Sequence, residues 1–273
     1  MTRTRGLNVG AVSYLNTKPL VYQFSELAPR AKLTFDYPSH LADQLAAGQL
    51  DVALIPAVEY FRGRDYSIVS DACIGCRGPV LSVKLFSRVP MNEIRTLALD
   101  EGSRTSAALV KILLNERYGI RPETTPLPVD ADLRETTTDA VLLIGDRAIF
   151  SPMGHFVEVW DLGDEWCRWA ELPFVFAMWV ARPGLDTGEL AELATALSTA
   201  RDRGVANLES IARAEAAPLG LTVPQCHSYL RDNLYFYFGP REQRGLALYY
   251  ERAVKLGLAP AGIAVGQALP DCV

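Results

Sequence analysis

Short apolar runs alternate with amphipathic segments through the first third of the chain. The runs at 7–12, 33–37 and 52–56 have the length and β-branched content of buried strands. Between them, the segment 41–47 has apolar positions at helical spacing and ends at Gly48. This strand–helix–strand order predicts parallel strands joined by right-handed crossovers. We therefore expect a sheet flanked by helices.

The same pattern restarts in the middle of the chain. An apolar run at 96–99 is followed by a polar loop, a helical segment at 107–118 and another apolar run at 140–144. A second strand–helix–strand order of this kind predicts a second α/β sheet.

No flexible linker separates the two patterns, so we expect two lobes joined by extended crossovers. The crossovers place lobe 1 at 1–86 together with 180–273, and an inserted lobe 2 at 87–179. Each lobe is expected to be a mixed, mostly parallel sheet flanked by helices. A ligand cleft would then lie between the lobes.

The last third of the chain is expected to be helical. The segments 187–216 and 226–258 both have helical periodicity, and the second one is rich in aromatic residues, Tyr229, Tyr235 and Tyr237 among them. Aromatic side chains clustered on a helical pattern are typical of packing between helices, and we interpret them in this way.

Composition limits the kinds of partner. The formal net charge of −5 gives no basic surface for a nucleic acid, so we expect no nucleic-acid binding. The apolar stretch before Ser13 is shorter than a signal-peptide core and no run is long enough to span a membrane, so we expect a cytoplasmic protein. The pair Cys73 and Cys76 has no second pair at zinc-site spacing, so we expect no metal.

Polar residues follow the first predicted strand. Ser13, Tyr14, Asn16 and Thr17 supply neutral hydrogen-bond donors and acceptors. Ligands of α/β sheets bind beyond the carboxyl ends of the strands, which makes these four residues candidates for binding. The alternative is a polar loop that only caps the following helix.

A second polar loop follows the run at 96–99. Ser103, Thr105 and Ser106 can cap the next helix, whose first N–H groups would remain free to bind a carboxylate or a phosphate. Plain helix capping is the alternative. Asp100 and Glu101 argue against a highly charged anion unless they point away.

Further candidates lie at the other strand ends. Gly145 permits close approach of the backbone to a ligand, and Asp146 can cap a helix or bind a hydroxyl group. Ser82 on the crossover faces either the cleft or solvent, and Phe174 contributes either to an apolar wall or to the core. No glycine-rich phosphate loop occurs, so no nucleotide cofactor is expected.

Five motifs taken together resemble a known family. They are Ser-Tyr-Leu-Asn-Thr at 13–17, Leu-Asp-Val-Ala-Leu-Ile-Pro at 50–56, Ser-Arg-Thr-Ser at 103–106, Leu-Ile-Gly-Asp at 143–146 and Leu-Pro-Phe-Val at 172–175. In this order, over residues 9–258, they resemble the menaquinone biosynthesis family of the futalosine pathway. The Ser-Tyr-Leu-Asn motif makes the similarity closest to the chorismate dehydratase branch.

The resemblance implies a two-lobed, type II periplasmic-binding-protein-like fold used as an enzyme. The implied reaction is that of a hydro-lyase, which removes water from chorismate to give 3-((1-carboxyvinyl)oxy)benzoate. By similarity, Asn16 and Ser82 would be catalytic. The other candidates would bind substrate, namely Ser13, Tyr14, Thr17, Ser103, Thr105, Ser106, Gly145, Asp146 and Phe174. The implied partner is the small molecule chorismate, with no cofactor, and a homodimer is compatible with the sequence.

Two alternatives stay open. One is the sister activity of the same family, 1,4-dihydroxy-6-naphthoate synthase. The other is a non-catalytic cytoplasmic protein that binds a small anion in the same two-lobed clamp, since folds of this kind host many functions.

Overall fold

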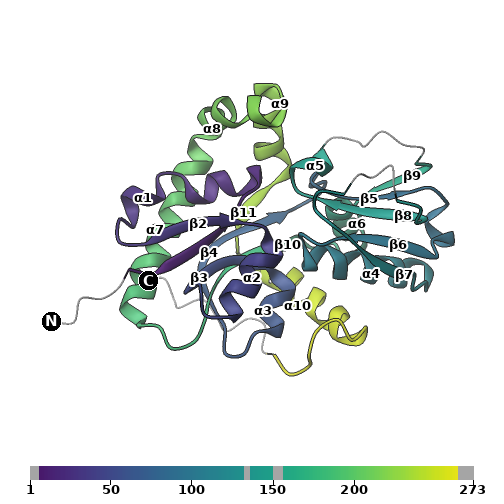
Figure 1. Ribbon diagram of the computed structural model, residues 1–273, viewed down its shortest axis with the longest axis horizontal. Coiled ribbons are helices and arrows are strands. Elements are labelled where there is room, and N and C mark those ends of the chain that lie inside the picture. The colour runs from purple at the N-terminus through teal and green to yellow at the C-terminus, as the bar shows by residue number, and fades with distance from the viewer. Residues whose placement is uncertain (1–5, 132–135, 150–155, 264–273) are drawn as a thin grey trace.

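The computed structural model describes residues 6–131, 136–149 and 156–263, and shows two α/β lobes side by side (Figure 1). The sheet of lobe 1 has the order β11 (Tyr235–Tyr237), β4 (Ser67–Cys76), β10 (Phe174–Ala181), β3 (Val52–Pro56), β1 (Asn8–Val12) and β2 (Lys32–Asp36). The sheet of lobe 2 has the order β7 (Glu123–Leu127), β6 (Thr96–Asp100), β8 (Ala140–Ile144), β5 (Val83–Ser87) and β9 (Glu158–Asp161). The expected two-lobed α/β architecture is confirmed.

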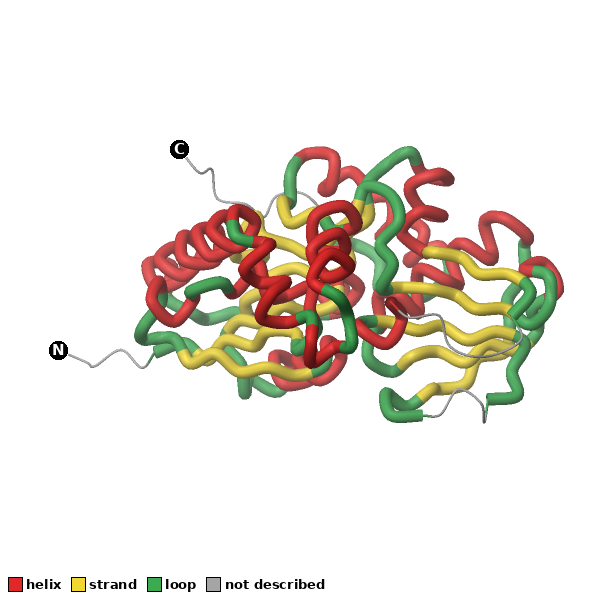
Figure 2. The backbone as a smooth tube through the Cα atoms, turned by 90° about the horizontal axis from the view of Figure 1, so that it is seen from above, coloured by secondary structure: helices red, strands yellow, loops and turns green. Residues whose placement is uncertain are grey.

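Helices cover both sheets (Figure 2). Those that follow strands of lobe 1 are η1 (Leu15–Val21), α1 (Phe24–Leu27), α2 (Pro38–Ala46), α3 (Ala57–Arg62), α7 (Thr187–Ala206), α8 (Leu208–Glu215), η4 (Ala217–Leu219), α9 (Val223–Ser228), η5 (Tyr229–Asn233) and α10 (Pro240–Lys255). Those that follow strands of lobe 2 are η2 (Met91–Glu93), α4 (Arg104–Tyr118), α5 (Asp146–Ile149) and α6 (Leu162–Ala170).

Both sheets are mixed. In lobe 1, β1 pairs in parallel with β2 and β3, as the strand–helix–strand pattern predicts. In lobe 2, β6 pairs in parallel with β7 and β8. Among the described strands, five pairs are antiparallel and four are parallel, because β10 and β5 run against both of their neighbours and β11 runs against β4. The expectation of mostly parallel sheets is therefore wrong.

The chain passes between the sheets at 77–82 and at 162–173. All of β5 pairs with β8 of lobe 2, from Val83 to Ser87, and all of β10 belongs to the sheet of lobe 1. Lobe boundaries between residues 86 and 87 and between residues 179 and 180 would cut through β5 and β10. We therefore propose that the lobes change within the two connecting segments instead.

The expectation of uninterrupted helix in the last third is wrong at two places. Helix α7 ends at Ala206, because the next residue, Asn207, has a φ of −124° and a ψ of 28°, which are not helical, and α8 begins at Leu208. The short strand β11 lies within 226–258 and pairs with the edge of β4. Its hydrogen bonds come from a strand far away in the sequence, so local periodicity cannot reveal it.

A single buried apolar cluster extends through both lobes and includes Trp166, Phe174 and Tyr249. Helix α4 of lobe 2 packs against α3 and α10 of lobe 1. The lobes are thus joined by a continuous core on one side, which fixes their relative position. Within the described part of the chain, no helix combines the length and apolar character that crossing a membrane requires.

Candidate functional site

A pocket lies between the lobes, at the ends of strands from both sheets. Its described lining consists of Val12, Tyr14, Asn16, Pro38, Pro56, Ile74, Val80, Ser82, Val83, Ser103, Ser106, Ile144, Gly145, Phe176 and Ala177. None of these side chains is charged. The pocket therefore offers neutral polar groups and apolar walls.

Six of the eleven candidate residues line this pocket. They are Tyr14, Asn16, Ser82, Ser103, Ser106 and Gly145. They come from all three strand-end loops and from the crossover, which are far apart in the sequence and meet here. The other five candidates, Ser13, Thr17, Thr105, Asp146 and Phe174, do not line it.

Asn16 lies in the first turn of η1, directly after β1, and only 9% of its surface is exposed. Its Oδ1 accepts a hydrogen bond from Thr17 Oγ1 at 3.3 Å. In this orientation the Asn16 amide nitrogen is left to donate to a ligand. The fully buried Thr17 thus supports Asn16. Ser13 is exposed, and its backbone N–H donates to the carbonyl oxygen of Asp36.

Ser103 caps α4 and accepts the Ser106 N–H at 3.3 Å, while the two hydroxyl oxygens lie 3.1 Å apart. The first N–H groups of a helix have no partner within the helix and mark its positive end. Because both serines line the pocket, this helix end is suited to an anion.

Thr105 points away from the pocket. Its Oγ1 accepts the Val58 N–H at 3.1 Å, and its carbonyl oxygen accepts the Tyr249 hydroxyl at 3.1 Å. Val58 and Tyr249 belong to lobe 1, so Thr105 joins the lobes and does not contact the pocket.

The acidic residues of the second loop also point away. Asp100 accepts the N–H groups of Gly102 at 2.9 Å and Ile144 at 3.1 Å, and forms an ion pair with Arg147 at 2.5 Å. Burial raises the pKa of Asp100, and the Arg147 guanidinium opposes this shift. Glu101 is exposed. Neither residue belongs to the pocket lining, and Arg147 pairs with the Asp100 charge, so the objection to an anionic ligand is weakened.

The Tyr14 ring crosses the cleft and lies against Gly145 of lobe 2. Gly145 has a φ of +70°, and a Cβ at this position would lie 2.6 Å from Tyr14 Cζ. A Cβ on Gly102 would lie 3.1 Å from the Tyr14 hydroxyl oxygen. Gly145 therefore needs to be glycine for this close approach, and space at Gly102 is tight. Burial, reinforced by the charge of Asp100, raises the pKa of Tyr14, so its hydroxyl keeps its proton.

Asp146 caps η1 of the opposite lobe instead of lining the pocket. Its carboxylate accepts the Leu15 N–H at 3.1 and 3.3 Å. Burial raises the pKa of Asp146 to about 6, although the Leu15 N–H lowers it. A backbone bond from the Ser39 N–H to the Gly102 carbonyl oxygen, at 3.1 Å, closes the same cleft.

Ser82 is buried at the end of the crossover, and its carbonyl oxygen accepts the Gly145 N–H at 2.9 Å. This bond ties the crossover to the third loop. Among the described residues, the hydrogen bond that the Ser82 hydroxyl donates is a long one, 3.4 Å to the Val80 carbonyl oxygen. It is therefore available to a ligand.

Phe176 lines the pocket, whereas Phe174 lies behind it. The two ring centroids are 4.7 Å apart, and Phe174 packs edge-to-face on Trp166 and Tyr249 in the core. The sequence predicts that Phe174 lies in an apolar wall of the cleft or in the core, but it gives no sign of which of the two rings faces the ligand. Phe174 and Phe176 are two residues apart in a strand, so alternation alone predicts the same face of the sheet for both.

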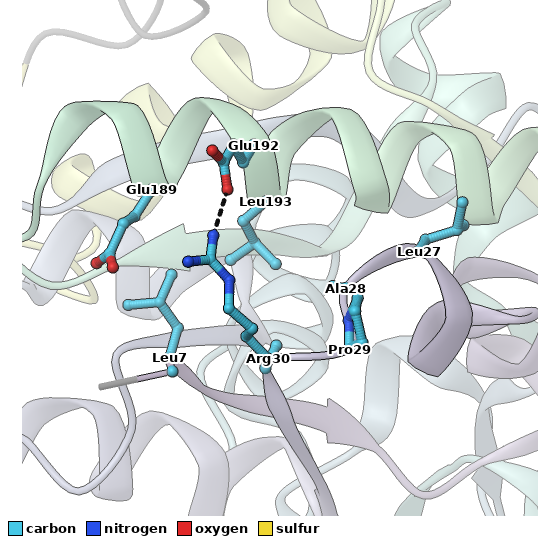
Figure 3. A pocket seen from close by; sticks show the side chains of 10 residues that line it. Leu7, Leu27, Ala28, Pro29, Arg30, Glu189, Glu192 and Leu193 are labelled. Atoms are coloured by element: carbon cyan, nitrogen blue, oxygen red, sulfur yellow. Dashed lines mark hydrogen bonds and ion pairs between the residues drawn. The ribbon is translucent and has the colours of Figure 1, made fainter. Parts of the chain in front are cut away.

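A hollow of lobe 1 lies where β1 begins, beside α7 (Figure 3). Its polar groups include an ion pair of 2.7 Å between Arg30 and Glu192, whose side chains are 65% and 72% exposed. None of the strand-end loops contributes to its lining. Exposed pairs of this kind are weak and typical of ordinary surface, so the pocket between the lobes is the candidate site.

Comparison with known proteins identifies relatives over nearly the whole chain. A family described as menaquinone biosynthesis matches residues 7–255. A chorismate dehydratase from Thermus thermophilus is 31% identical over 269 residues, which cover 92% of this chain and 96% of that protein.

Solved structures show the same fold. A crystal structure of an Archaeoglobus fulgidus protein superposes with a TM-score of 0.75 at 17% identity, covering 94% of this chain and 99% of that one. The alkanesulfonate-binding protein SsuA from Xanthomonas axonopodis pv. citri gives 0.66 at 13%, covering 97% and 98%. A Candida albicans gene product with the generic periplasmic binding protein fold gives 0.61 at 10%, covering 95% and 92%. The fold is periplasmic-binding-protein-like, as expected.

Proposed function

Because the chain belongs to the menaquinone biosynthesis family, we propose that it is a chorismate dehydratase, a hydro-lyase that forms 3-((1-carboxyvinyl)oxy)benzoate and water. One observation carries the proposal. The Asn16 amide, the Ser82 hydroxyl and the N-terminus of α4 meet in an uncharged pocket between the lobes. The similarity to the Thermus thermophilus enzyme supports the same assignment.

Chorismate has two carboxylates, a ring hydroxyl and a flat apolar ring. The hydroxyls of Ser103 and Ser106, with the end of α4, can bind a carboxylate without a charged side chain. Ile74, Ile144 and Phe176 can contact the ring. The pocket thus contains each type of group that this substrate needs.

The proposed chemistry needs no strong base from the protein. The C3–H and C4–O bonds break, a double bond forms between C3 and C4, and the ring becomes aromatic, so the substrate supplies much of the driving force. The C3 proton passes to the enolpyruvyl carboxylate of the substrate itself. The hydroxide that leaves C4 takes this same proton from the enolpyruvyl carboxyl group and becomes water, so the carboxylate is regenerated and the protein neither gains nor loses a proton.

In this scheme the protein orients and encloses the substrate. The Asn16 amide holds the reacting groups by hydrogen bonds, and Ser82 and the end of α4 bind carboxylate. Closure by the bonds from Leu15 to Asp146 and from Ser39 to Gly102 excludes water from the pocket. The absence of charged side chains from the described pocket lining favours this scheme over general-base catalysis.

The test is to incubate the purified protein with chorismate and to follow the loss of one water by mass spectrometry. Asn16→Ala serves as the comparison, and formation of the product by the wild type alone supports the proposal. Conversion of a cyclised futalosine derivative would identify the sister naphthoate synthase instead. Unchanged chorismate together with tight binding of another small acid would identify a binding protein.

A further inference from the structure

Tyr229 begins η5, a single π-helical turn between α9 and β11. Such turns are rare and are frequently found at functional sites. Asn233, at the end of this turn, donates from Nδ2 to the Pro79 carbonyl oxygen at 2.9 Å. The turn is therefore fastened to the crossover that carries Ser82.

The Tyr229 side chain is buried, with 2% of its surface exposed, and its hydroxyl oxygen has no hydrogen-bond partner among the described residues. Buried polar groups in native proteins are nearly always paired, because an unpaired one costs free energy. A fully packed aromatic ring could fill this space without a hydroxyl. The unpaired hydroxyl therefore calls for a role other than packing.

The two proposed catalytic side chains lie beside this hydroxyl. Ser82 and Asn16 are close enough to stabilise a phenolate, although neither has hydrogen-bond geometry to the oxygen. Burial raises the pKa of Tyr229 well above its usual range and outweighs the opposite effect of these two neighbours. At neutral pH the group is thus a protonated phenol that can both donate and accept.

We propose that Tyr229 is a positioning residue of this site, which acts through Asn16 and Ser82. Small rotations of these side chains bring them into hydrogen-bond geometry with the Tyr229 hydroxyl. The hydroxyl then fixes the direction in which the amide of Asn16 and the hydroxyl of Ser82 face the ligand. The kinetic part of this inference rests on the proposed dehydratase function, whereas the effect on Asn16 does not.

The test is Tyr229→Phe, which removes only the hydroxyl. We expect kcat for chorismate to fall about tenfold, with a change in KM of less than about threefold, because orientation is needed most in the transition state. The thermal midpoint should change little, since the Tyr229 hydroxyl has no hydrogen bond of normal geometry among the described residues and only its weaker contacts with Asn16 and Ser82 are lost.

Tyr250→Phe is the matched control. The Tyr250 hydroxyl donates to the Pro260 carbonyl oxygen at 3.0 Å, away from the pocket. This variant should have a lower thermal midpoint and unchanged kcat. The two substitutions thus separate a role in the site from the general loss of a tyrosine hydroxyl.

A second measurement is independent of turnover. The side-chain amide signals of Asn16, assigned by their loss in Asn16→Ala, should shift in the NMR spectrum of Tyr229→Phe and not in that of Tyr250→Phe. Unshifted Asn16 signals, or wild-type kcat in Tyr229→Phe, would overturn the inference. If the wild type does not convert chorismate, the proposed function fails, and the Asn16 signals alone decide the role of Tyr229.

Discussion

The carboxylate of Asp146 in lobe 2 accepts the backbone N–H of Leu15 in lobe 1, at 3.1 and 3.3 Å. It thereby caps a helix that belongs to the other lobe. Asp146 is also buried enough that its pKa rises to about 6. The Asp146 carboxyl group, which joins the lobes, therefore changes its charge near pH 6.

Asp146 should make the stability of the protein depend on pH. Its folded-state pKa is above the unfolded value of 3.8, so the folded state binds more protons between these two values. The free energy of unfolding should then fall as the pH rises from about 4 to about 6, by about 3 kcal/mol at most.

Asp146→Asn keeps an acceptor for the Leu15 N–H and cannot ionise. It should be more stable than the wild type above pH 6 and equal to it below about pH 4, as measured by chemical denaturation at each pH. An equal difference at both pH values would show that this carboxyl group does not titrate as described. Turnover should remain substantial, because Asp146 does not line the pocket.

Asn16→Ala should lose most of the turnover of chorismate, on the order of 100-fold in kcat, because the amide orients the reacting groups. Glu59→Gln is the control. Glu59 lies outside the pocket, in ion pairs with Arg62 at 2.7 Å and Arg104 at 3.5 Å. It should keep a substantial part of the activity. Complete loss in Glu59→Gln with an intact fold would identify a base from the protein.

Gly145→Ala should destabilise the protein for two reasons, a φ of +70° and a Cβ that meets the Tyr14 ring. We expect the free energy of unfolding to fall by about 2–4 kcal/mol. Gly48→Ala is matched to it, since Gly48 has the same φ of +70° and open space around its Cβ position. That variant should lose only about 1 kcal/mol in the same denaturation experiment. Equal losses would mean that the contact with Tyr14 is not close.

Asp100→Ala should be among the most damaging substitutions in lobe 2. The Asp100 side chain is fully buried and holds Arg147 and two backbone N–H groups, so its removal should cost about 3–5 kcal/mol of unfolding free energy. Asp43→Ala breaks an ion pair of 2.8 Å with Arg104, in which the two side chains are 60% and 36% exposed. It should cost less than about 1 kcal/mol. Similar costs for the two variants would contradict the structural role of Asp100.

Local hydrophobic patterns are sufficient to predict the strands that are buried on both faces. The runs 52–56 and 140–144 are strands at the predicted residues, because a short apolar run between polar segments allows little else. The strand Tyr235–Tyr237 was missed, since its pairing with β4 is a tertiary contact.

For the site, the sequence located the loops but not which side chain of each loop faces the ligand. Ser103 and Ser106 line the pocket, whereas the side chain of Thr105 between them binds the Val58 N–H of lobe 1. That choice follows from the direction of α4, which depends on how lobe 2 docks onto lobe 1. The sequence predicts only packing for Tyr229 for the same reason, because its nearness to Asn16 and Ser82 exists only in the folded chain.

The bond from the Ser39 N–H to the Gly102 carbonyl oxygen involves no side chain at either end. Substitutions that reshape the pocket therefore leave this attachment of the lobes in place. One contact between the lobes thus depends on the backbone alone, whereas the pocket lining is formed by side chains. Side chains of the lining can therefore be exchanged while this bond between the lobes is kept.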